Sequence, residues 1–181
     1  MLKKFFLSVL VMLVVLTVIG FFLPKDYEVK RTQPIEASPE AIVAFVTDLK
    51  TWPEWSAWGK EAYPNCVWTF DEDGKSMSWD GPDAGKGRLT ITEATSEVIR
   101  WDMGFGEEGM DSKGGLLLET TPTGTQVSWF MSGRLEGPIG GWMNMMIDGM
   151  VGPYFEENLN SIKELVEAEK DTLQGIPYLA Q

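Results

Sequence analysis

The middle of this 181-residue chain alternates apolar and polar residues with a period of two, in consecutive stretches separated by turn residues. Such alternation is typical of strands with one buried face, and a turn such as Asp73-Gly74 is typical of a hairpin. Strands that are joined by hairpins pair antiparallel, so we predict an antiparallel sheet rather than alternating βαβ units. The alternating stretches are residues 67–70, 75–80, 87–93, 97–105, 115–121 and 126–135.

Helical spacing of apolar residues flanks the predicted sheet on both sides. Ser38 followed by Pro39 is a typical helix start, and apolar residues recur at helical spacing over 40–49. After the last predicted strand, apolar residues recur at three- and four-residue steps over 139–166. The pattern is interrupted near Pro153, where we expect a kink or a break.

The predicted elements follow one another as a strand over 27–36, two short helices, about six hairpin-linked strands and one long helix. The sequence therefore predicts an α+β fold, in which a curved antiparallel sheet of about six to seven strands wraps on the long C-terminal helix. A helix that is laid along a curved sheet leaves room for a cavity between them.

The composition excludes several classes of function. The chain has a formal net charge of −12, no histidine and a single cysteine, Cys66. A chain this acidic is repelled by phosphate backbones, so we expect no nucleic-acid partner. Without histidine, Ser-His-Asp and Cys-His catalysis and the usual zinc sites are excluded, and one cysteine forms no internal disulfide. We expect neither a metal site nor a cofactor.

The first segment of the chain is apolar on every side. Residues 5–23 carry no charge, and as a helix they span roughly 28 Å at about 1.5 Å per residue, close to the bilayer core of about 30 Å. A cleaved signal peptide is the alternative, but its apolar stretch is shorter, and residues 20–24 offer no small-residue cleavage site. We predict a single-pass membrane protein with an uncleaved transmembrane helix. Basic residues flank both ends of the helix, so the side of the membrane that holds the domain stays open.

We divide the chain into an N-terminal transmembrane anchor (residues 1–25), one domain (residues 26–170) and a C-terminal tail (residues 171–181). Gly175 and Pro177 lie in the last of these and are typical of a loose tail.

Aromatic and methionine side chains gather on faces of three strands and the terminal helix that are predicted to point inward. Tryptophan carries an N–H group that needs a partner, and methionine adapts to varied ligands, so this composition suits a binding pocket as well as a filled core. We predict that an apolar ligand is held between the sheet and the terminal helix by Trp79, Trp101, Met103, Phe105, Trp129, Met131, Trp142, Met146 and Met150.

Four stretches of the chain, in order, resemble the SRPBCC superfamily, which includes START lipid-transfer domains and polyketide cyclase/dehydrase-like proteins. The resemblance covers roughly residues 27–168 and implies a helix-grip fold. Its members include carriers, receptors, cyclases and co-chaperone-type proteins, and a fold alone does not choose among them. The four stretches are residues 37–40 (Ala-Ser-Pro-Glu), the tryptophan-rich residues 52–58, residues 79–91 and residues 148–156.

These observations favour a membrane-anchored protein that binds a hydrophobic small molecule or lipid. The first alternative is a polyketide cyclase/dehydratase-like enzyme, although the chain lacks the histidine to which some cyclases assign acid–base roles. Asp148, two residues from both Met146 and Met150, is a candidate general acid for such an enzyme if it is buried. The second alternative is a scaffold that binds another protein.

Overall fold

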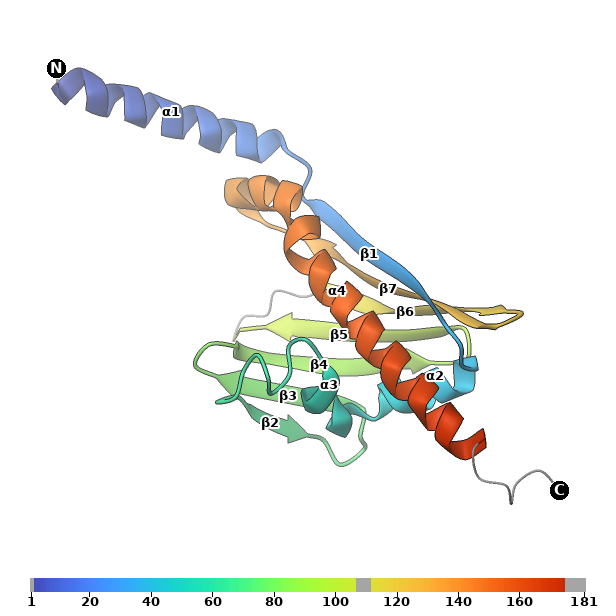
Figure 1. Ribbon diagram of the computed structural model, residues 1–181. Coiled ribbons are helices and arrows are strands. Elements are labelled where there is room, and N and C mark those ends of the chain that lie inside the picture. The colour runs from blue at the N-terminus through green and yellow to red at the C-terminus, as the bar shows by residue number, and fades with distance from the viewer. Residues whose placement is uncertain (1, 107–111, 175–181) are drawn as a thin grey trace.

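A computed structural model describes residues 2–106 and 112–174 and shows one long helix lying across one face of an antiparallel sheet (Figure 1). The strands are β1 (Asp26–Ile35), β2 (Val67–Phe70), β3 (Ser76–Gly81), β4 (Gly85–Ala94), β5 (Val98–Phe105), β6 (Ser112–Thr121) and β7 (Gly124–Arg134). The helices are α1 (Leu2–Phe22), α2 (Pro39–Thr47), the short 3-10 helix η1 (Leu49–Thr51), α3 (Trp52–Trp55) and α4 (Gly137–Gln174).

The sheet has seven strands in the order β1-β7-β6-β5-β4-β3-β2, and every pair is antiparallel. The hairpin order predicted from β2 to β7 is confirmed. β1 comes first in the chain but pairs with the last strand, over the full length from Asp26↔Arg134 to Ile35↔Thr125. The predicted α+β helix-grip architecture is therefore correct.

The helix α2 begins as its sequence predicts. The Ser38 hydroxyl accepts a hydrogen bond from the Ala41 backbone N–H at 3.3 Å, and Pro39 occupies the first turn, where its missing N–H costs no helical hydrogen bond.

The sequence predicted a kink or a break near Pro153, and the helix α4 continues through this residue without a break. The helix changes direction in its first half (Figure 1). The Arg31 side chain of β1 hydrogen-bonds to Asp148 before this proline and to Glu156 after it, so both flanks are fixed to the sheet. The helix runs to Gln174 and so includes the first four residues expected in the tail; residues 175–181 lie outside the described part of the chain.

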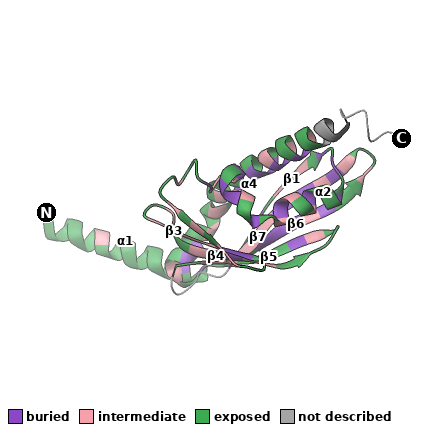
Figure 2. Cartoon of the chain, turned by 90° about the horizontal axis from the view of Figure 1, so that it is seen from below, coloured by how far each residue is buried: buried purple, intermediate pink, exposed green. Residues whose placement is uncertain are grey.

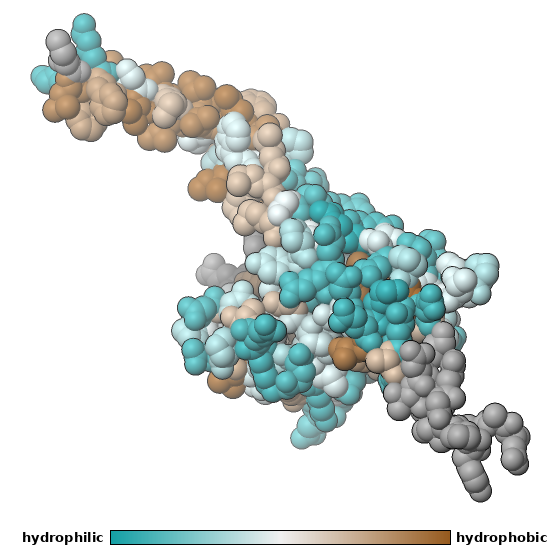
Figure 3. All heavy atoms as spheres, in the orientation of Figure 1, coloured by the Kyte–Doolittle hydropathy of each residue, from teal (hydrophilic) through white to brown (hydrophobic). Residues whose placement is uncertain are grey.

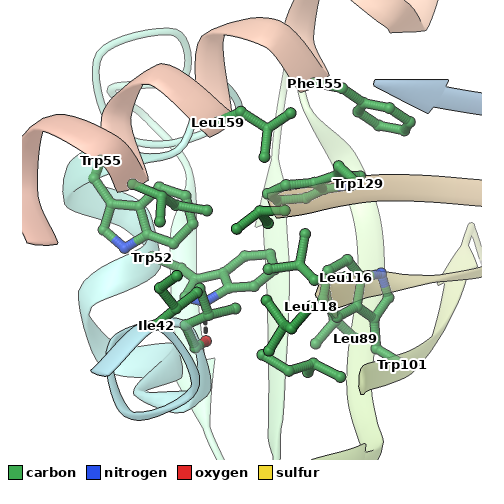
Figure 4. Packing of buried hydrophobic residues seen from close by; sticks show 14 of the residues in the cluster. Ile42, Trp52, Trp55, Leu89, Trp101, Leu116, Leu118, Trp129, Phe155 and Leu159 are labelled. Atoms are coloured by element: carbon green, nitrogen blue, oxygen red, sulfur yellow. Dashed lines mark hydrogen bonds between the residues drawn. The ribbon is translucent and has the colours of Figure 1, made fainter. Parts of the chain in front are cut away.

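The core lies between α4 and the sheet, where the buried residues concentrate (Figure 2). Trp101 and Trp129 from the sheet meet Phe155 and Leu159 from α4, and all four are at most 2% exposed (Figure 4). Trp52 packs against both sheet tryptophans, and its indole N–H donates to the Val46 carbonyl at 2.7 Å. The α3 segment is thus joined to the same core.

The helix α1 is exposed along almost its whole length and projects away from the sheet (Figures 1 and 2). It is long and apolar enough to cross a membrane, and its length and composition also fit a signal sequence. Its C-terminal end contacts the start of α4, and Gly20 is its one buried residue among those described.

We expect Leu159→Ala to lower the free energy of unfolding by about 2–5 kcal/mol, because the fully buried side chain leaves a cavity between α4 and the sheet. Leu165→Ala is the matched control on the same helix, where the side chain is 45% exposed, and its effect should stay within about 0.5 kcal/mol. Urea unfolding of the full-length protein in detergent micelles measures both. Equal losses in the two variants would contradict the assignment of the buried face of α4.

Candidate functional site

A cavity of about 330 Å³ lies between α4, the sheet and the segment around α3. Most of its wall is aromatic or aliphatic. Three polar side chains, Ser56, Tyr63 and Tyr27, interrupt that wall, and no aspartate, glutamate, lysine or arginine of the described residues lines it. The cavity is therefore suited to a neutral, largely apolar molecule with few hydrogen-bonding groups.

Six of the nine predicted pocket residues line this cavity, all of them from the sheet. They are Trp79, Trp101, Met103, Phe105, Trp129 and Met131. They belong to β3, β5 and β7, and those that share a strand are two residues apart, so they point to the same side of the sheet. The period-two pattern therefore placed these side chains correctly, although their binding of a ligand stays a prediction.

The other three predicted residues, Trp142, Met146 and Met150 of α4, do not line the cavity. The α4 residues that do are Ile147, Val151 and Phe155. Each methionine comes one residue before a lining residue, and one residue on a helix with 3.6 residues per turn is a rotation of about 100°. Met146 and Met150 are 62% and 55% exposed, and the Trp142 indole N–H donates to the Leu16 carbonyl of α1 at 3.1 Å.

The cavity is also lined by eleven residues that were not predicted from the sequence. They are Tyr27, Trp52, Ser56, Trp58, Tyr63, Trp68, Met77, Ala84, Ile147, Val151 and Phe155. The tryptophan-rich residues 52–58 were the available signal, because an aromatic cluster outside the strands still needs a place to be buried. The positions 147, 151 and 155 also repeat at the four-residue spacing of one helix face.

Two cavity tryptophans lie over glycines of the neighbouring strand. Trp79 is paired with Gly87, and Trp101 with Gly114. A Cβ atom added at either glycine would overlap the indole ring of its partner. The missing side chains let these two rings lie against the sheet, so the glycines help to set the depth of the cavity wall.

The polar groups of the wall are neutral donors and acceptors. Burial raises the pKa of the Tyr27 hydroxyl above its ordinary value of 10, so this group stays protonated at neutral pH. The Trp68 indole N–H is buried and has no hydrogen-bond partner among the described residues. This N–H is closed off from solvent, so it leaves an uncompensated polar group behind the cavity wall.

Asp148 is not a buried acid. Its side chain is 61% exposed and forms an ion pair with Arg31 at 2.8 Å. The hydrogen bonds from the guanidinium hold the pKa of the Asp148 carboxyl below its ordinary value. This residue therefore stays ionised and does not fit the role of general acid for which the sequence made it a candidate.

Arg31 fastens β1 to α4 through this carboxylate and a second one. Its Nε atom donates to Glu156 Oε1 at 2.8 Å, and the guanidinium lies over Gly152, where a Cβ atom would overlap it. The two carboxylates raise the pKa of Arg31 further above its already high value. Because Ile147 and Val151 belong to the same turns of α4, this contact also positions the cavity wall.

We expect Arg31→Gln to raise the pKa of the Asp148 carboxyl towards its ordinary value of about 3.8, because the cation that stabilises the charged form is removed. In the wild type the pair stabilises the fold above the unfolded-state pKa, and this stabilisation is lost as the pH falls through the lower folded-state pKa. An NMR titration of the Asp148 carboxyl carbon measures the shift. Arg134→Gln is the control, since Arg134 pairs with Asp26 and should leave Asp148 unchanged.

Comparisons with known proteins agree with this architecture. A family model described as "Polyketide cyclase / dehydrase and lipid transport" matches residues 26–167. A search of curated protein sequences found no significant match.

Solved structures of low sequence identity share the fold. A START superfamily protein from Mycobacterium smegmatis is 18% identical, with a TM-score of 0.54 over 78% of this chain and 98% of that one. A protein of unknown function, SA2116 from Staphylococcus aureus, is 12% identical, with a TM-score of 0.61 over 81% and 97%. The di-domain ARO/CYC StfQ from the steffimycin biosynthetic pathway is 13% identical, with a TM-score of 0.61 over 81% of this chain and 53% of that one.

Proposed function

The chain belongs to the polyketide cyclase / dehydrase and lipid transport family, and we propose that it is a membrane-anchored member that binds a hydrophobic small molecule or lipid. The observation that carries this proposal is the cavity of about 330 Å³ with its aromatic wall. Ligand pockets in proteins are mostly apolar, with a few polar groups that orient the ligand, and this wall has that composition.

The size of the cavity narrows the ligand. Its 330 Å³ is close to the lower end of the range of about 300–1,000 Å³ for ligand pockets. It corresponds to about eleven water molecules at roughly 30 Å³ each. This volume suits a ring-containing molecule or a single short acyl chain better than a whole two-chain phospholipid. The flat tryptophan faces favour rings, which stack on them.

The side chains of the cavity wall also favour a binding function over a catalytic one. A cyclase or dehydratase moves protons, and an efficient acid or base has a pKa near the working pH. The titratable groups that the described residues contribute to the wall are two tyrosines, and burial raises the pKa of Tyr27 away from neutrality. The candidate acid Asp148 lies outside the cavity in an ion pair.

We further propose that α1 stays attached and spans the membrane, with residues 26–170 as the domain that it anchors. At about 1.5 Å per residue its 21 residues reach roughly 31 Å, which matches a bilayer core. Specific contacts join it to the domain: Trp142 donates to the Leu16 carbonyl, and the Asn144 side chain donates to the Pro24 carbonyl at 3.0 Å. Cleavage of a signal peptide would remove the first of these partners.

We expect Val151→Trp to abolish ligand binding, because the larger side chain fills the cavity from α4. Met150→Trp is the matched control one residue earlier, where the side chain is 55% exposed and outside the cavity. Binding is measured by energy transfer from protein tryptophan to the neutral probe N-phenyl-1-naphthylamine, and by native mass spectrometry of co-purifying apolar molecules.

The wild type and Met150→Trp should bind the probe or retain a bound molecule, and Val151→Trp should not. Equal binding by all three proteins would place the site elsewhere. A wild type that neither binds the probe nor retains any molecule would reject the binding function.

The anchor is tested separately, by extraction of membranes with alkaline carbonate. We expect the full-length chain to stay in the membrane pellet, because an apolar helix of this length partitions into the bilayer. A domain released by cleavage after α1 would appear in the wash at a lower mass, and that result would contradict the proposal that α1 stays attached.

A further inference from the structure

We propose that the first turns of α4, residues 137–150, lie in the membrane interface beside the end of α1 and give the domain a second contact with the bilayer. This surface is called the α4 tip below. The inference rests on α1 as a membrane span, and it adds an interaction surface that the anchor alone does not require.

The contacts between the two helices set the depth of the α4 tip. The Trp142 indole donates to the carbonyl of Leu16, which lies six residues before the last residue of α1, Phe22. Six residues of helix correspond to about 9 Å along its axis. If α1 crosses the bilayer, the tip must therefore lie beside the last two turns of the span rather than in the water beyond it.

The two helices approach closely at a pair of glycines. A Cβ atom at Gly141 would overlap the Gly20 carbonyl, and a Cβ atom at Gly20 would overlap the Pro138 carbonyl. Small residues at a helix contact are typical of packing between membrane helices, where backbones come close. The Asn144 amide also donates to the Pro24 carbonyl just beyond α1. The tip is thus fastened at several points to the end of the span.

The outer surface of the α4 tip is built for an apolar environment. Residues 137–147 include no charged residue, and Asp148 is the first charge in the helix. The large apolar side chains that stay exposed in the tip are Ile139, Trp142, Met143, Met145, Met146 and Met150. In Figure 3 the brown surface of α1 continues into tan and brown atoms at this junction before the surface turns teal. Interfacial helices bury such a face about 5–10 Å into the boundary of headgroups and acyl chains.

A lipid bilayer fits this surface better than a protein partner does. The start of α4 contacts the end of α1, and both helices carry exposed large apolar side chains up to this junction. Lys25 lies at its border, with its ammonium 5.6 Å from the centre of the Phe21 ring. The acidic side chains nearby are paired with arginines: Asp26 and Glu136 with Arg134, and Asp148 with Arg31. Lysine and tryptophan are typical of the level at which a span leaves the hydrocarbon core.

The position of the tip also bears on the ligand. Ile147, at the end of the charge-free stretch, and Val151 on the next turn line the cavity from a side of the helix that is rotated by about 100° from Met146 and Met150. One helix, about 10–12 Å across with its side chains, then separates the bilayer from the ligand site. A hydrophobic ligand that is dissolved in the bilayer would reach the cavity by a small displacement of this helix, without crossing bulk water.

The test measures where three positions of the full-length protein lie in vesicles of three parts phosphatidylcholine to one part phosphatidylglycerol. In a Cys66→Ser background, Met145→Cys reports on the α4 tip, Leu165→Cys on an exposed site of the same helix away from α1, and Val11→Cys on the span. Each cysteine carries a bimane fluorophore. Spin-labelled lipids quench the fluorophore from the bilayer, and iodide quenches it from water.

We expect lipid quenching and a loss of iodide quenching at positions 145 and 11, and the reverse at position 165. Iodide quenching at position 145 together with lipid quenching at position 11 would contradict the membrane contact of the α4 tip. The same result would still agree with α1 as a membrane span. Protection of position 145 from both quenchers would also contradict the membrane contact, because a protein surface would then cover the tip. Iodide quenching at position 11 would contradict the proposal that α1 spans the membrane.

Discussion

One helix covers a sheet that is much wider than the helix is, and this mismatch creates the cavity. Seven strands are separated by six spacings of about 4.8 Å, or roughly 29 Å, whereas a helix with its side chains is about 10–12 Å across. A chain of touching rings fills part of the difference: Trp52 lies 5.5 Å from Trp101, Trp101 5.3 Å from Trp129, and Trp129 5.6 Å from Phe155, measured between ring centres. The cavity is the part that these rings border but do not fill.

Polar contacts on the two sides of α4 hold the helix over this cavity. On the β1 side, Arg31 reaches Asp148 and Glu156. On the α3 side, the fully buried Asn158 accepts a hydrogen bond from the Ala57 backbone N–H at 2.7 Å. A purely apolar helix face would allow the helix to slide or rotate, because apolar contacts are not directional. Hydrogen bonds to fixed backbone and side-chain atoms specify one position, and with it which α4 side chains form the cavity wall.

The sequence predicted the hairpins and the strand faces, which depend on residues close together in the chain. It did not predict how α4 is rotated about its own axis. Alternation and turns predicted the hairpins, and the same alternation placed the strand side chains, such as Trp101 and Met131, on the cavity face. On α4, however, both Met146 and its neighbour Ile147 are apolar, and so are Met150 and Val151. The prediction that apolar side chains point inward cannot choose between two adjacent apolar stripes. The choice follows from contacts far apart in the sequence, namely Arg31 with Asp148 and Trp142 with Leu16.

The charge distribution is consistent with the orientation that we propose for the domain at a membrane. The first 31 residues hold five of the 15 basic and two of the 27 acidic residues, which leaves 10 basic and 25 acidic residues, a net charge of −15, in the other 150. An anionic leaflet attracts basic side chains and repels acidic ones over about a Debye length. Lys25 and Lys30 follow the end of α1, and the charge-free start of α4 contacts that end. If α1 spans the bilayer as we propose, this end of the domain would approach an anionic surface with less repulsion than the acidic remainder, which would then face water.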